Sequence, residues 1–181
     1  MTSSDQKSLK VMVIYILNKT GGLDYYRIFK VLYFAEMEHL AMWGARMIED
    51  DFCALQHGPV PTQLYDAVKG LETKSTELAR LLSDSLEFAG VDAPNVLLAN
   101  REANMGRISK ASQEALDKSI EENVSLSFKA LRRKSHDKAW EAAFNSSDKK
   151  MSSTAIAKVK GIDECTLAYL EEHLAIQAAL A

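Results

Sequence analysis

Residues 25–43 read YYRIFKVLYFAEMEHLAMW, and this stretch decides the fold. Its spacing predicts a helix that is apolar on much of its circumference, with Tyr26, Ile28, Phe29, Val31, Leu32, Tyr33, Leu40 and Ala41 as the apolar positions. A helix of this kind is packed from several sides. Asp24 is suited to cap its first turn and Gly44 to end its last. We therefore expect a central helix around which the rest of the chain folds.

The segments on either side of this helix predict one more helix and a small β element. Residues 6–19 have the spacing of a one-faced amphipathic helix, which Gly21 and Gly22 would end. After the central helix, residues 46–48 and 51–55 suggest a hairpin that turns at Glu49 and Asp50. The run Gly58-Pro59-Val60-Pro61 follows. Because prolines keep the chain extended and withhold backbone donors, this run predicts a rigid turn, with Pro61 as a possible start of the third helix.

The remaining two thirds of the chain add mostly short helices. The expected elements are a helix over 75–82, an extended region over 86–98, a helix capped by Ser109 to about 122, a helix over 125–133, a stripe of His136, Trp140 and Phe144 on one helix, and two helices after Met151 split at Gly161. The fold class is therefore mainly α, a compact helical domain with a small β-hairpin or short sheet inserted after the second helix. We expect residues 1–150 to form this domain and residues 151–181 to form a C-terminal helical extension packed on it.

Composition narrows the class of protein. The chain has 181 residues, of which 47% are hydrophobic and 26% are charged, values that suit a globular domain. The formal net charge of −3 lacks the basic excess of nucleic-acid-binding proteins, so nucleic acid is not an expected partner. The polar first ten residues do not form a signal peptide, no apolar run approaches the length of a membrane span, and the two cysteines lie far apart. We expect a cytoplasmic protein without a membrane partner.

Three blocks of sequence together resemble a known family. They are Lys30-Val31-Leu32-Tyr33-Phe34-Ala35-Glu36 with His39-Leu40 and Gly44, then Asp51-Phe52-Cys53-Ala54-Leu55-Gln56-His57-Gly58-Pro59-Val60-Pro61 with Leu64-Tyr65-Asp66, and Lys134-Ser135-His136-Asp137-Lys138-Ala139-Trp140. This set resembles the Panacea domain family, also described as SocA-type antitoxins or phage-associated GepA-like proteins. The resemblance covers roughly Leu9 to Phe144.

The resemblance implies a function that composition does not. Such domains are typically the antitoxin half of toxin–antitoxin pairs and bind the toxin directly, and the toxins vary across the family. We therefore expect an antitoxin that neutralises a cognate toxin by protein–protein binding, and not an enzyme. One alternative is an adapter that delivers the toxin to a Clp-type protease, as in a branch of the family. Another is a DNA-binding autoregulator that uses the C-terminal helices. Assembly into a homo-oligomer stays open.

Candidate partner-binding residues lie in and after the predicted hairpin. They are Phe52, Leu55, His57, Pro59, Val60, Pro61 and Tyr65. A stiff Gly-Pro-Val-Pro segment would present the hairpin to a partner at a low ordering cost. The competing interpretation is that the segment is a turn required by the fold. Phe52, Leu55 and Tyr65 would anchor a partner if exposed and belong to the core if buried.

A second candidate group consists of polar and aromatic residues of the family motif. Its members are Tyr33, Glu36, His39, Asp51, His136 and Trp140. Glu36 and His39 have the Glu-x-x-His spacing of di-metal helical bundles, but such bundles need this pair twice and the sequence has it once. We expect no metal and no cofactor. A buried hydrogen-bond network at the junction of helix and hairpin is the favoured interpretation of the group, and a catalytic base at His136 is the alternative.

The C-terminal segment is weighed as a DNA-binding element. Residues 153–174 partly fit helix-turn-helix spacing around Gly161. The second of the two helices, however, carries acidic residues, namely Asp163, Glu164, Glu171 and Glu172. Carboxylates repel phosphates, so DNA binding by this segment is not favoured.

Overall fold

The computed structural model describes residues 1–180, so Ala181, the last residue of the predicted extension, lies outside the described residues. The described residues form nine α-helices: α1 (Ser3–Thr20), α2 (Tyr25–Trp43), α3 (Thr62–Lys69), α4 (Glu77–Ser83), α5 (Lys110–Asn123), α6 (Phe128–Ser135), α7 (Lys138–Phe144), α8 (Ser153–Val159) and α9 (Glu164–Leu180). A single 3₁₀ turn covers Met105–Arg107.

Five short strands form two antiparallel sheets within the same residues. The strands are β1 (Leu23–Asp24), β2 (Phe52–Leu55), β3 (Gly58–Pro61), β4 (Leu86–Phe88) and β5 (Val96–Ala99). Strands β2 and β3 form a hairpin, and the second sheet has the order β1-β5-β4. The prediction of a mainly α fold with a small hairpin after the second helix is confirmed.

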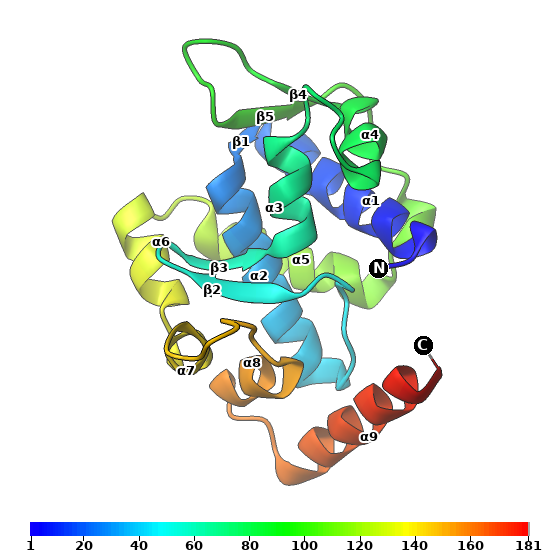
Figure 1. The fold of residues 1–181 in the computed structure, drawn as a ribbon, viewed down its shortest axis with the longest axis vertical. Coiled ribbons are helices and arrows are strands. Elements are labelled where there is room, and N and C mark those ends of the chain that lie inside the picture. The colour runs from blue at the N-terminus through cyan, green and yellow to red at the C-terminus, as the bar shows by residue number, and fades with distance from the viewer. Residues whose placement is uncertain (181) are drawn as a thin grey trace.

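Helix α2 lies at the centre of the molecule, as its sequence predicts. It runs through the middle of the view in Figure 1, with the hairpin crossing it and α5 and α8 packed along it. The Asp24 side chain caps its first turn by accepting from the backbone N of Arg27 at 3.0 Å. Gly44 ends it in the left-handed conformation, with φ +59°. Most of α2 is buried, including the side chains of Lys30 and Glu36.

The hairpin forms from different strands than the sequence predicts. Residues 46–48 are a loop, because the backbone N–H groups of Met47 and Ile48 donate to Glu36 and do not pair with a strand. The run Gly58–Pro61 is instead the second strand, paired with Phe52–Leu55 across a two-residue turn. Two prolines are tolerated here because β3 is an edge strand, and an edge has no partner for the missing donors.

Residues that follow α7 complete the sheet on the other side of β2. The backbone N of Ala54 donates to the O of Lys149 at 2.8 Å, and the N of Met151 donates to the O of Phe52 at 2.8 Å. The chain therefore returns to the hairpin before α8 begins. The division into a domain up to residue 150 and a separate extension stays a prediction.

The aromatic stripe near the end of the family motif does not lie on a single helix. His136 ends α6, and Asp137 begins α7 as its N-cap. The rings of His136, Trp140 and Phe144 nevertheless stack in sequence.

Helices α8 and α9 form the C-terminal end, and α9 lies along the lower right of the molecule in Figure 1, with its last turns bordering a hollow that Asp5, Arg46 and Glu49 also line. They are split at Gly161, as predicted, since this residue has φ +70°. No helix within residues 1–180 is both long and apolar enough to cross a membrane.

Candidate functional site

The family-motif residues meet where α2, the hairpin and α7 join, and a buried tyrosine lies at the centre of this junction. The hydroxyl of Tyr33 donates to Oδ2 of Asp137 at 2.7 Å. The other carboxylate oxygen of Asp137 accepts from the backbone N of Trp140 at 3.0 Å and so caps α7. Burial raises the pKa of both Tyr33 and Asp137. One carboxylate therefore fixes α7 and satisfies the only polar group of a core tyrosine.

Trp140 connects α7 to the hairpin. Its indole Nε1 donates to the backbone O of Leu55 at 2.9 Å. Its ring stacks on His136 with centroids 3.7 Å apart and on Phe144 with centroids 4.5 Å apart. His136 acts here as a flat packing surface, and burial lowers its pKa. Trp140, supported by His136, therefore stabilises the position of the hairpin relative to α7.

A buried lysine holds the other strand of the hairpin. Nζ of Lys30 donates to the backbone O of Pro59 at 2.6 Å. Burial lowers its pKa to about 7. The fit above it is tight, because a Cβ at Gly58 would lie 2.6 Å from Oγ of Ser135 and 2.8 Å from Cε of Lys30. With φ +100° as well, position 58 requires glycine.

Glu36 and His39 hold the loop that leads from α2 to the hairpin. Glu36 Oε2 accepts from the backbone N of Met47 and of Ile48, both at 2.9 Å, and burial raises its pKa to about 7. Nδ1 of His39 bonds the backbone O of Ala45 at 2.8 Å. The Glu-x-x-His pair is thus directed at the backbone of its own loop.

The six residues of the polar group lie in three places. Tyr33, His136 and Trp140 belong to the junction, Glu36 and His39 hold the loop, and the half-exposed Asp51 pairs with Lys150 at 2.7 Å. Within residues 1–180, no three histidine, cysteine, aspartate or glutamate side chains gather in an arrangement suited to a metal ion.

A comparison of the sequence with known protein families identifies the domain to which this junction belongs. The sequence profile described as "Antitoxin SocA-like, Panacea domain" matches residues 28–141, well over half of the chain. The chain belongs to the SocA-like antitoxin family. The match begins in α2 and ends in α7, so the Panacea domain contains the whole junction, whereas α8 and α9 lie outside the match. No curated protein and no solved structure gives a match.

Burial divides the predicted partner-binding residues of this Panacea domain. Phe52, Pro59, Val60 and Pro61 are buried in the chain, so their side chains belong to the core and offer no exposed surface for a partner. They are core because β3 lies over α2 and Phe52 packs its ring on Tyr33 at 5.5 Å. Tyr65 is partly buried against the core, with its ring 6.1 Å from that of Phe29. Leu55 and His57 are exposed.

The exposed side of the junction is an apolar and aromatic surface between the hairpin and α6. Phe128, the first residue of α6, is exposed, and its ring lies 6.0 Å from that of His57. We call Leu55, His57 and Phe128 the hairpin rim. Arg132 and Arg133 on α6 are exposed as well, so the helix that contributes Phe128 is basic.

Four residues of this region have side-chain roles that the sequence does not predict: Lys30, Asp137, Asp50 and Phe128. Lys30 and Asp137 lie within the motif blocks quoted above, and this position in the motif is the one sequence feature that points to them. Asp50 is fully buried and accepts from the backbone N of Gln63 at 3.1 Å and of Leu64 at 2.9 Å. It thereby caps α3, whose N-cap residue, Pro61, has no side chain that can do so. Asp50 and Phe128 carry no comparable signal.

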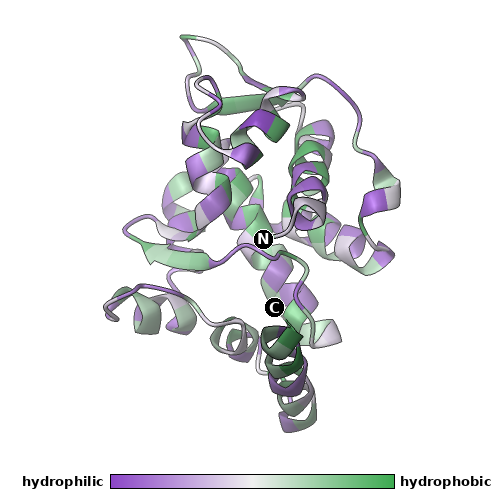
Figure 2. Ribbon diagram, turned by 45° about the vertical axis from the view of Figure 1, so that its right-hand side comes forward, coloured by the Kyte–Doolittle hydropathy of each residue, from purple (hydrophilic) through white to green (hydrophobic). Residues whose placement is uncertain are grey.

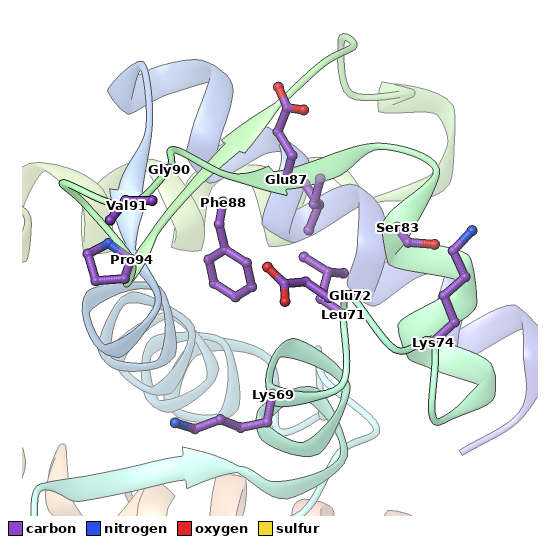
Figure 3. A pocket seen from close by; sticks show the side chains of 11 residues that line it. Lys69, Leu71, Glu72, Lys74, Ser83, Glu87, Phe88, Gly90, Val91 and Pro94 are labelled. Carbon is purple, nitrogen blue, oxygen red and sulfur yellow. The ribbon is translucent and has the colours of Figure 1, made fainter.

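A hollow of about 780 Å³ lies at the other end of the molecule, below the β4–β5 loop. Figure 3 shows Phe88 and Leu71 directed toward it, with Lys69 and Glu72 on the α3 side. It shares no lining residue with the junction or the hairpin rim.

Proposed function

We propose that this chain is an antitoxin that neutralises a cognate toxin by direct protein–protein binding, with the hairpin rim as a contact surface. The family supports an antitoxin role. The observation that carries the proposal is the contrast across the junction: Tyr33, Asp137 and Trp140 direct their hydrogen bonds to this chain, while Leu55 and Phe128 are exposed on the outer side. Exposed aromatic and apolar side chains grouped together are typical centres of protein interfaces.

Binding, and not catalysis, is the proposed mode of action. Glu36 and Asp137 are the buried acids of the motif, and both accept hydrogen bonds from backbone N–H groups of this chain. Lys30 donates to a backbone carbonyl. These bonds support a role in shaping the surface that the hairpin presents.

Two other modes of action are separable by experiment. An adapter would bind the toxin and also a Clp-type protease, and would protect cells only where the protease is present. An autoregulator would use α8 and α9 on DNA, but α9 carries Glu164, Glu171 and Glu172 and no lysine or arginine. This charge disfavours contact with phosphates.

Co-expression tests the proposal in cells. The product of the neighbouring open reading frame is expected to stop growth when produced alone, and this chain is expected to restore growth. A Leu55→Asp, Phe128→Asp variant is expected to bind that product about 30-fold more weakly, since loss of an interface centre typically costs 2 kcal/mol or more. Growth with the variant should therefore be restored only partly.

Val91→Asp is the matched control. Val91 is 96% exposed in the β4–β5 loop, far in the fold from the hairpin rim, and should tolerate aspartate without a loss of protection. The proposal is contradicted if the neighbouring product is harmless or if this chain does not restore growth. Equal protection by the Leu55, Phe128 variant would reject the hairpin rim alone.

A further inference from the structure

Helix α9 has one face packed on the molecule and one face that is largely exposed. Leu170 is fully buried, and Leu167 and Leu174 are partly buried beside it. They lie three and four residues from Leu170, which places them on a single stripe against α8 and α2. This stripe attaches α9 to the body.

The opposite face carries large apolar side chains in solvent. Tyr169, Ile176 and Leu180 are 55%, 52% and 83% exposed. Their spacings of seven and four residues place them on one side of the helix, and Cys165 and Glu172 lie on the same side, giving a four-three-four repeat from Cys165 to Ile176 that Leu180 extends by four residues. That repeat is the seam along which one helix packs on another. Figure 2 shows apolar residues on several sides of α9.

Exposed apolar residues also lie at the end of α2, where α9 packs against it and where Met42 and Trp43 border a hollow beside α5. A Cβ at Gly44 would lie 2.7 Å from Cδ1 of Tyr169, so the tyrosine ring packs directly on the end of α2. The two residues before Gly44 are Met42 and Trp43, which are 60% and 51% exposed. We call Met42, Trp43, Tyr169, Ile176 and Leu180 the C-terminal face. It holds five of the eight large exposed hydrophobic residues of the described chain.

The unpaired charges of α9 select its partner, since the cations that border the face, Lys118 and Arg46, are already paired with acids of the body. Helix α9 contains Glu164, Glu171 and Glu172 and no lysine or arginine, and none of the three glutamates forms a salt bridge within residues 1–180. A second copy of the chain packed along α9 would bring the same acids against these glutamates. A basic partner would neutralise them, because interfaces match opposite potentials.

We propose that the C-terminal face docks a lysine- and arginine-rich amphipathic helix of the toxin. This inference rests on the proposed function and specifies the chemistry of the partner. Apolar side chains of the toxin helix pack between Tyr169, Ile176 and Trp43, and its basic side chains pair with the free glutamates of α9. Because α8 and α9 lie outside the matched domain, the contact adds a toxin-selecting surface to the one on the hairpin rim.

Isothermal titration with the purified neighbouring product and the full chain tests this inference. The Tyr169→Asp, Ile176→Asp variant is expected to bind at least about 30-fold more weakly than the unmodified chain. Glu172→Lys is expected to weaken binding and to reduce its dependence on salt, since one attractive charge pair is lost. The matched controls are Val91→Asp, an apolar-to-acid change elsewhere, and Glu121→Lys at an exposed position of α5.

Each outcome separates the two proposals. If the unmodified chain does not bind the neighbouring product, the proposed function fails and this inference falls with it. If the unmodified chain and the α9 variants bind equally, only this inference is wrong. The α9 variants could bind the toxin as tightly as the unmodified chain but fail to support its removal by a protease. That result would assign the face to the protease and contradict the inference. So would a dimer of the unmodified chain that Tyr169→Asp converts to a monomer. Circular dichroism and the milder Ile176→Ser exclude loss of folding as the cause.

Discussion

Replacing Asp137 with alanine is expected to lower the free energy of unfolding by about 3 kcal/mol. The change removes the N-cap of α7, which typically costs about 1 kcal/mol. It also leaves the hydroxyl of Tyr33 without an acceptor in the core, where an unsatisfied donor costs about 1–3 kcal/mol. Urea unfolding at neutral pH measures the sum.

Tyr33→Phe provides the matched variant for this prediction. It removes the hydroxyl and leaves the cap of α7 intact, so a loss of about 1 kcal/mol is expected. In the Asp137→Ala, Tyr33→Phe double variant no donor is stranded, and its loss should be smaller than the sum of the two single losses. Additive losses would show that the two side chains do not act together.

The stability of the protein is expected to rise with pH above neutrality because of Lys30. Its pKa is about 7 in the folded chain, whereas an exposed lysine, as in the unfolded chain, has a pKa of 10.5. Between these values the unfolded chain binds a proton at Lys30 that the folded chain does not, so the free energy of unfolding increases as pH rises. Each unit contributes about 1.4 kcal/mol, which gives a rise of about 3 kcal/mol from about pH 7 to about pH 9.5.

Lys30→Met tests whether this side chain is the cause. Methionine fills similar space without an ionisable group, so the rise between neutral and alkaline pH should be largely absent in the variant. Denaturant unfolding at several pH values gives both curves. An equal rise in the two proteins would mean that Lys30 titrates as an ordinary exposed lysine.

The sequence predicts the central helix well because its signals are local. Apolar spacing, Asp24 before the helix and Gly44 after it all act within a few residues, and each has the expected role. The partners of the hairpin strands are not local. Pro59 reads as part of a turn, and only the contact of its carbonyl with Lys30, 29 residues earlier, places it in a buried strand.

The sequence predicts which residues belong to the candidate site but not how their side chains are arranged in it. The motif contains Tyr33, His136 and Trp140, and they do meet. Whether a polar side chain bonds inward or faces a partner depends on distant backbone, such as the N–H groups of Met47 and Ile48 for Glu36. The exposure of Phe128 and Ile176 likewise depends on which neighbours the fold leaves uncovered.

If this antitoxin neutralises its toxin by direct binding, a titration in a purified system is the most direct test. Increasing amounts of this chain are added to a fixed amount of the neighbouring product, with the activity of that product as the readout and no protease present. Neutralisation by binding predicts a linear fall in activity that is complete near a fixed molar ratio, together with a stable complex. Full activity at excess antitoxin, or complete loss of activity at a catalytic trace of it, would contradict the account.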